Sequence, residues 1–176
     1  MASLDKGAHH PELLDFCVQP LLDQLDAAFG PIAMGKGLRW DVTPSIERVR
    51  SNPLLLEHML RHLVDNAVRF TSKGGVVVSS RLSGACLLMQ VWDTGLGIAP
   101  QVQERVFEAF FPHATDDDGD AGMALPTVRS SAQALGIEVS LRSVPGRGSC
   151  FSLRVPLAQA AAAHRDATAA ALSPTA

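Results

Sequence analysis

Residues 91–100 read VWDTGLGIAP, and this short stretch decides how the rest of the chain is interpreted. An apolar pair leads into Asp93, and Gly95 and Gly97 follow with one leucine between them. A carboxylate at the end of an apolar run can accept a hydrogen bond from a ligand, and nearby glycines let the backbone turn closely beside it. The motif alone equally describes a strand that ends in a turn, because glycine adopts a positive φ at little cost.

Composition and charge limit the classes of protein to which the chain can belong. It has 176 residues, of which 47% are hydrophobic, so we expect one globular domain with a sizeable core. The formal net charge is −3, and the sequence shows no basic patch of the kind that marks nucleic-acid or membrane surfaces. No apolar run reaches the roughly 20 residues that span a bilayer. We therefore expect no nucleic-acid partner, no direct membrane contact and a cytoplasmic location, with any inner-membrane anchor in another part of the parent protein.

The cysteines give little sign of chemistry. Cys17, Cys86 and Cys150 lie far apart and show no Cys-x-x-Cys spacing. An odd, scattered set argues against a disulfide framework and against a zinc site. We expect them to be buried, small apolar residues in a reducing compartment.

Hydrophobic spacing predicts the elements of the first half of the chain. Apolar residues at helical spacing run from Pro11 to Phe29, with a kink or break at Pro20, and Gly35 and Gly37 end the element. Residues 38–42 then alternate like a strand. Asn52 followed by proline begins a helix that runs to about Phe70, because asparagine caps a helix and proline suits its first turn.

The second half adds two hairpins and two helices. Residues 75–93 form a hairpin around Ser83-Gly84, and residues 137–157 form another around Pro145–Gly148. A short helix near 101–106 and a longer one over 123–135 lie between them. This order predicts an α+β, two-layer sandwich with helices on one face of a mixed sheet. The domain is expected over 11–157, with a disordered leader at 1–10 and an Ala-rich disordered tail or linker at 158–176.

Five blocks of the sequence, in this order, resemble the ATP-binding catalytic domain of sensor histidine kinases, one branch of the Bergerat-fold ATPases. The likeness covers about residues 11–157 and implies the Bergerat fold, two-component signal transduction, and ATP and Mg²⁺ as cofactors. The blocks are LVDNAVRFT (63–71), VWDTGLGI (91–98), VFEAFF (106–111), AGMALPTV (121–128) and PGRGSCFSLRVPL (145–157).

The resemblance implies roles for particular residues. Asp93 resembles the acid that accepts a hydrogen bond from the adenine amino group, and a buried acceptor of this kind discriminates strongly against ligands without the donor. Asn66 matches the asparagine that binds Mg²⁺, whose preference for oxygen ligands an amide carbonyl satisfies; otherwise it is a helix-surface amide. Ser149 resembles the residue that supports the acid and adenine, often through water; otherwise it is a plain strand serine.

Further residues are assigned to the nucleotide site by the same resemblance. Arg69 lies where the family often has a phosphate-facing cation, at i, i+3 from Asn66, although a solvated surface charge fits equally. Gly95 and Gly97 let the backbone turn beside the nucleotide. Four more residues belong to the matching blocks or to their surroundings: Ile98, Gly122, Leu125 and, as a residue that would contact a phosphate, His62.

The sequence also departs from the family pattern. His62 stands where the kinases usually carry an asparagine, and it either contacts a phosphate or marks a lost contact. The family has a second glycine-rich motif, called the second glycine box, which aligns with residues 120–125 and keeps only Gly122 here. If Ala124 must adopt a positive φ there, that conformation costs on the order of 1 kcal/mol. Between Phe110 and Gly122 the chain carries four aspartates, at 116, 117, 118 and 120, and no Lys or Arg. This acidic segment would repel a triphosphate by roughly 1 kcal/mol for each close pair of negative charges. Either it turns outward, or extra Mg²⁺ bridges it, or nucleotide binding is weak or lost.

The resemblance implies a domain that presents the ATP γ-phosphate to a histidine on a separate dimerisation domain, and so acts indirectly on a response regulator. No catalytic phosphoacceptor is expected here, because His9 and His10 precede a proline in a polar leader and His58 and His62 lie on the nucleotide-site helix. The isolated domain is not expected to autophosphorylate. The alternative is a degenerate, non-catalytic Bergerat-fold module used for protein docking, and an anti-sigma-factor serine kinase is a third, less favoured interpretation.

Overall fold

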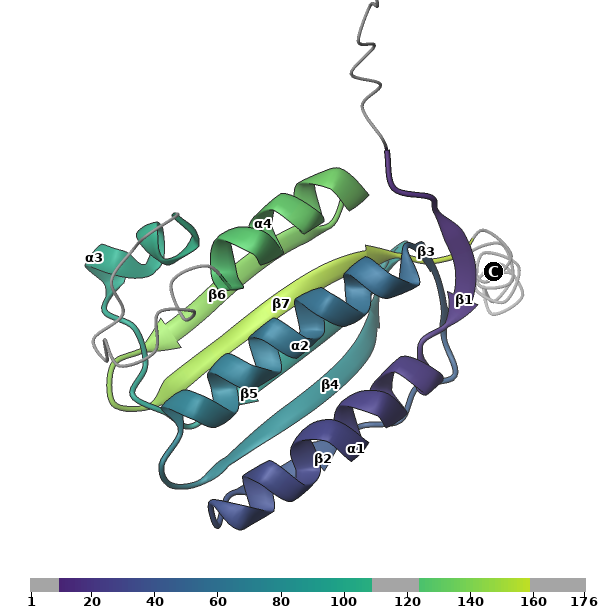
Figure 1. Cartoon of the computed structure of the whole chain (residues 1–176). Coiled ribbons are helices and arrows are strands. Elements are labelled where there is room, and N and C mark those ends of the chain that lie inside the picture. The colour runs from purple at the N-terminus through teal and green to yellow at the C-terminus, as the bar shows by residue number, and fades with distance from the viewer. Residues whose placement is uncertain (1–9, 109–123, 159–176) are drawn as a thin grey trace, which may run out of the picture.

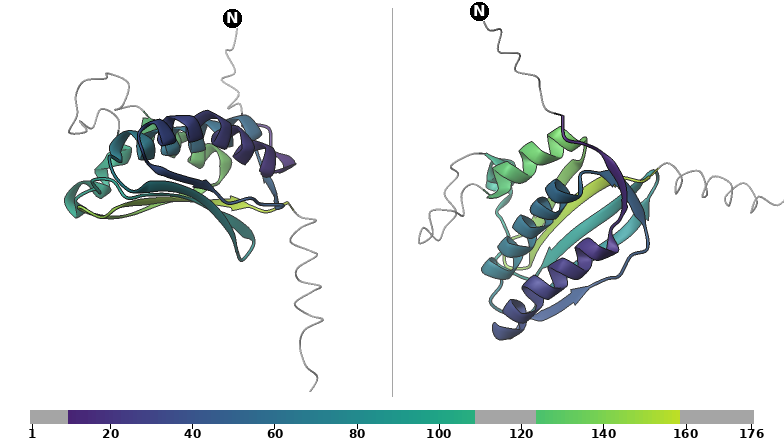
Figure 2. Two further views of the ribbon diagram at one scale, coloured as in Figure 1. Left: turned by 90° about the horizontal axis from the view of Figure 1, so that it is seen from below. Right: turned by 45° about the vertical axis from the view of Figure 1, so that its right-hand side comes forward.

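A computed structural model describes residues 10–108 and 124–158 of the chain (Figure 1). These residues form two layers, with the helices gathered on one face of a mixed five-stranded sheet, as the view along the layers in Figure 2 shows. The predicted α+β, two-layer architecture is confirmed. Within the described ranges, no helix is long and apolar enough to cross a membrane.

The five-stranded sheet is built mainly from the two predicted hairpins. Its strand order is β2-β4-β5-β7-β6, and only the β2–β4 pair is parallel. Period-2 alternation directs apolar side chains from each strand to the helix-covered face. The strands are β2 (Arg39–Val42), β4 (Gly75–Ser83), β5 (Cys86–Asp93), β6 (Glu138–Val144) and β7 (Gly148–Pro156).

Helix α2 (Pro53–Phe70) lies across the middle of the sheet (Figure 1). It begins as the sequence predicts, because the Asn52 side chain accepts a hydrogen bond from the Leu55 amide at 3.0 Å and Pro53 opens the first turn. The other helical elements are α1 (Gln19–Gly35), α3 (Pro100–Gln103), the 3₁₀ turn η1 (Arg105–Phe107) and α4 (Ala124–Leu135).

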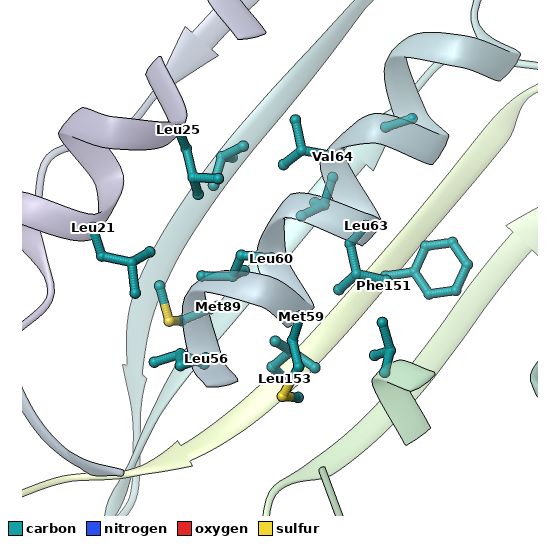
Figure 3. Close-up of a cluster of buried hydrophobic side chains, with 14 of the residues drawn as sticks. Leu21, Leu25, Leu56, Met59, Leu60, Leu63, Val64, Met89, Phe151 and Leu153 are labelled. Atoms are coloured by element: carbon teal, nitrogen blue, oxygen red, sulfur yellow. The ribbon is translucent and has the colours of Figure 1, made fainter. Parts of the chain in front are cut away.

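The core lies between α2 and the sheet, with α1 and α4 on either side. Figure 3 shows side chains of α1 and α2 meeting side chains of β5 and β7. Burying each leucine contributes roughly 1.5–3 kcal/mol, so this contact holds the two layers together. The cluster includes Leu21, Leu25, Leu56, Met59, Leu60, Leu63, Val64, Met89, Phe151 and Leu153.

The prediction of helical structure from Pro11 is wrong for the residues before Pro20. Residues Leu14–Cys17 form strand β1, which pairs antiparallel with β3 (Arg48–Ser51), a strand that the sequence analysis did not predict. Of the two effects expected at Pro20, the structure has a break and no kink: Pro20 lies in the first turn of α1, where a missing N–H removes no helical hydrogen bond. The helix ends at Gly35, as the glycines at 35 and 37 predict.

The expected burial of the cysteines is only partly correct. Cys150 is buried, whereas Cys17 and Cys86 are half-buried, and all three are free thiols. The expected leader and tail lie outside the described residues except for His10 and Ala158. Ala158 is buried, and its amide donates to the Arg48 carbonyl at 3.0 Å.

Candidate functional site

Asp93, the last residue of β5, carries a carboxylate held by backbone donors. Its Oδ1 accepts from the Gly95 amide at 2.9 Å and from the Ser149 amide at 3.3 Å. Burial raises the pKa of Asp93 above its usual value, and the hydrogen bonds from Gly95 and Ser149 oppose that rise. The acid is therefore fixed in orientation at the point where β5 and β7 end their pairing.

The glycines around Asp93 allow several backbone segments to pack together. A Cβ on Gly95 would lie 2.6 Å from the Phe70 carbonyl, at the C-terminal end of α2. Gly97 has φ +71°, and a Cβ there would overlap the Val144 carbonyl. Gly148 has φ +116°, and a Cβ there would overlap the Asp93 carbonyl. Close approach is thus required within the protein itself, and an approach to a nucleotide stays a prediction.

Ser143 and Gln103 connect this loop to the β6–β7 hairpin. The Ser143 Oγ accepts from the Ile98 amide at 2.7 Å and lies 2.8 Å from the Ser149 Oγ. The Gln103 Nε2 donates to the Ile98 carbonyl at 2.8 Å and to the Ser143 carbonyl at 3.0 Å. Sequence reasoning missed both residues, because a strand serine and a glutamine on a short helix form no local motif.

The three candidate site residues on α2 differ in their exposure and in their contacts. Asn66 is buried, with 8% of its surface exposed. Arg69 is exposed and its guanidinium pairs with Asp65 at 3.2 Å. His62 is half-buried, and its ring centre lies 6.5 Å from that of His58 in an edge-to-face arrangement. The structure thus places Asn66 in the protein interior and Arg69 in an exposed ion pair.

The second glycine box is described only in part. Gly122 and the acidic segment before it lie outside the described residues. Leu125 is buried in the first turn of α4. Ala124 begins the helix, so the expected cost of a left-handed residue does not arise at that position. Ile98, by contrast, is half-buried and joins the network through its backbone.

Comparison with known proteins agrees with this geometry. Residues 51–159 match the family described as "Histidine kinase-, DNA gyrase B-, and HSP90-like ATPase". Among curated proteins, the sensor protein TorS of Escherichia coli (strain K12) is 37% identical over 111 residues, covering 63% of this chain and 12% of TorS. The sensor histidine kinase RcsC of Salmonella typhimurium is 29% identical over 149 residues, covering 81% of this chain and 16% of RcsC. The chain thus spans less than a fifth of these relatives.

Solved structures give the same family and fold. Full-length ShkA, crystallised in complex with AMPPNP, superposes with a TM-score of 0.71 at 30% identity, over 84% of this chain and 32% of ShkA. The catalytic domain of the histidine kinase ThkA superposes with a TM-score of 0.72 at 19% identity over 83% of this chain and 96% of that domain, which shows the shared fold. The chain therefore belongs to the family of histidine kinase-, DNA gyrase B- and HSP90-like ATPases, as an ATPase catalytic domain of the sensor histidine kinase type.

Proposed function

We propose that this domain binds ATP together with Mg²⁺ and presents the γ-phosphate to a histidine on a separate dimerisation domain of its parent kinase, from which a response regulator receives it. The observation that carries the proposal is the fixed carboxylate of Asp93. Two backbone amides hold its Oδ1, and no hydrogen bond to Oδ2 is recorded within residues 10–108 and 124–158. That second oxygen can accept a ligand donor.

This arrangement favours adenine over guanine. The exocyclic group of adenine is an amino donor, whereas guanine has a carbonyl acceptor at the same position. An ionised Asp93 would accept from the first and repel the second. A buried polar group that is left unpaired costs about 1–3 kcal/mol, so the acid supports clear selectivity for ATP over GTP.

Asn66 fits a role at Mg²⁺. Asn66 as a residue is 8% exposed, and its side-chain amide makes no hydrogen bond to another described residue, so the amide is free to meet a ligand. Mg²⁺ keeps several waters and is commonly bound by few protein groups together with phosphates. The described residues contain no cluster of three or more His, Cys, Asp or Glu side chains that would enclose a metal, so phosphates and water would supply most of the ligands.

Phosphoryl transfer in such a domain depends chiefly on positioning and charge neutralisation. Bound Mg²⁺ would neutralise phosphate charge, while Asp93 orients the base and Asn66 contacts the ion. Arg69 would reach a phosphate only by leaving its ion pair with Asp65. His62, four residues before Asn66, would lie close enough to the same end of the ligand to contact a phosphate. We place the domain in the cytoplasm, with any membrane anchor elsewhere in the parent.

A degenerate docking module remains the second candidate. The departures at His62 and in residues 120–125, together with the acidic residues 116–118, favour it. These features would weaken phosphate binding without disturbing the fold, because α2 and α4 form in spite of them. The two candidates differ in one measurable property, which is nucleotide affinity.

Titration with a non-hydrolysable ATP analogue, with and without Mg²⁺, tests the proposal by calorimetry. We expect saturable, Mg²⁺-dependent binding, much weaker binding of the GTP analogue, and loss of binding in Asp93→Asn. Asp41→Asn, an equal change on β2, is the matched control and should bind normally. Absence of binding to the wild-type domain at millimolar nucleotide would favour the docking module.

A further inference from the structure

Among the described residues, no helix covers the second face of the sheet. Figure 2 shows α1, α2 and α4 on the opposite side. Strand alternation directs one row of residues across all five strands toward this open face: Asp41, Val77, Trp92, Cys150 and Arg142. Trp92 lies in the middle of the row and is 47% exposed. Val77, its partner on β4, is 36% exposed, so the two side chains form a small apolar patch on neighbouring strands of this face.

The open face is rich in arginine. Arg39, Arg81 and Arg142 occupy its positions on β2, β4 and β6, and none has an ion pair with a described acid. Arg154 on β7 faces the same way, 3.9 Å from Glu138. Asp41 and Glu138 are the acids that alternation places among them. The face is therefore net positive, although the whole chain carries a net charge of −3.

A hollow of about 660 Å³ lies at one end of this face. Trp92 and Val77 provide its apolar wall, and Arg39 and Arg147 are its basic residues. Arg147, in the turn between β6 and β7, is likewise without a recorded ion pair to any described residue. Gly37, Gly74 and Gly75, together with Asp93 and Thr94, line the remainder, and the three glycines contribute no side chains to fill the space. We call this feature the Trp92 hollow.

We propose that the Trp92 hollow docks an acidic segment of a protein partner, with an apolar or aromatic side chain against the Trp92 indole and carboxylates against Arg39 and Arg147. Trp and Arg are the residue types most enriched among energetically dominant contacts of protein interfaces. Guanidinium groups bind carboxylates with two parallel hydrogen bonds, which suits an acidic peptide.

The charges argue against a nucleic acid or an anionic membrane as the occupant. Polyanions are bound by dense basic surfaces that neutralise many phosphates. Of the described residues, Arg39 and Arg147 are the two cations that line the hollow, and Asp41 lies two residues from Arg39 on the same strand. The net charge of −3 also repels a polyanion at long range. A short acidic segment carries fewer charges than a polyanion, so the net charge opposes its approach less.

Docking here is independent of the proposed nucleotide site. Asp93 borders the hollow, but its Oδ1 is held by Gly95 and Ser149, and alternation along β5 directs its side chain toward the helices, away from Trp92. Peptide binding can therefore be measured without nucleotide. Failure of one proposal leaves the other unaffected.

The experiment uses the indole N–H signals of the two tryptophans in the full chain. The probe is a synthetic peptide in which glutamates flank a central phenylalanine. The charge control is the same peptide with lysines in place of the glutamates. We expect a saturable shift of the Trp92 signal that weakens with added salt. The Trp40 indole donates to Asp26 at 2.7 Å on the helix side, so its signal should stay fixed and reports that the protein remains folded.

Variants identify the contacts. Arg39→Gln and Arg147→Gln should each weaken binding up to about fivefold, as one exposed charge pair does. Trp92→Ala should weaken it about tenfold or more. Arg129→Gln, an equal change on α4 in the helical layer, should have no effect. The proposal is overturned if the glutamate peptide causes no Trp92 shift at millimolar concentration. Equal binding of the lysine peptide, or tighter binding of a single-stranded oligonucleotide or of anionic vesicles, would also overturn it.

Discussion

The Ser143 hydroxyl accepts a hydrogen bond from the Ile98 amide at 2.7 Å, although the two residues are 45 positions apart. The same oxygen lies 3.0 Å from the Gly148 carbonyl and 2.8 Å from the Ser149 Oγ. One small side chain thus fixes the loop after Asp93 to the hairpin that supplies a second donor to Asp93. The position of the acid depends on a contact that no sequence motif marks.

Replacing Ser143 with alanine should loosen this connection. The Ile98 amide would lose its acceptor, and an unpaired, partly buried N–H costs about 1–3 kcal/mol. We expect the free energy of unfolding to fall by that amount in urea titrations, and the amides from Gly95 to Ile98 to exchange faster with solvent. Ser140→Ala, at an exposed position on the same strand, is the control. Equal stability of the two variants would contradict a linking role for Ser143.

We expect the charge on Asp93 to lower the stability of the fold and to favour nucleotide binding. Its pKa is raised in the folded state, so the native protein takes up a proton at higher pH than the unfolded chain does. Its contribution to stability therefore grows as the pH falls through the raised pKa, and diminishes as the pH rises through the same window. Asp93→Asn should abolish this dependence and be no less stable than wild type at neutral pH, while nucleotide binding is lost. Carboxyl NMR titration and urea unfolding at several pH values measure the two effects.

The raised pKa of Asp93 should also affect nucleotide binding. In the proposed site an ionised Asp93 accepts from adenine, so affinity should decline on acidification at a higher pH than an ordinary aspartate would give. Unchanged affinity across that window would show that Asp93 does not accept from the base. Asp41→Asn should leave the pH profile of binding unaltered.

The sequence predicts this fold where local signals agree with tertiary packing. Both hairpins and the α2 boundaries follow from glycines, from Asn52 and from periodicity. The sequence does not predict β1, because its four residues continue the helical spacing and become a strand only by pairing with β3. It does not predict β3 either, because arginines occupy the exposed positions of that strand and hide its apolar pattern. For the site, resemblance marks Asp93 and Asn66. The partners Ser143 and Gln103 depend on contacts between distant segments, which spacing does not reveal.

Two asparagines on or next to α2 should behave in opposite ways. Asn66→Leu removes a buried amide with no recorded hydrogen bond to the described residues, so stability should be kept or slightly increased, while the Mg²⁺-dependent part of ATP affinity is lost. Asn52→Ala removes the cap of the helix and should cost about 1 kcal/mol of stability without changing nucleotide affinity. Calorimetric titrations with and without Mg²⁺ and thermal unfolding separate the two. Full Mg²⁺ dependence in Asn66→Leu would exclude Asn66 as a ligand.

The two glycines of the β6–β7 turn offer a sharper test of the close packing around Asp93. Gly146 has φ +77° and open space where a Cβ would lie, whereas a Cβ on Gly148 would overlap the Asp93 carbonyl. Gly146→Ala should therefore cost only the left-handed conformation, about 1–2 kcal/mol. Gly148→Ala adds a steric overlap that backbone atoms must move to relieve, so its cost should exceed about 4 kcal/mol or prevent folding.

The comparison between these glycines is informative because both changes add one methyl group to the same turn. Urea unfolding measures the difference in stability, and the backbone signals of Asp93 and Ser149 report where a folded Gly148→Ala protein has moved. We expect those signals to shift in Gly148→Ala and to remain in place in Gly146→Ala. If both variants lost the same stability, the hairpin would not be pressed against Asp93, and the acid would be held by its two hydrogen bonds alone.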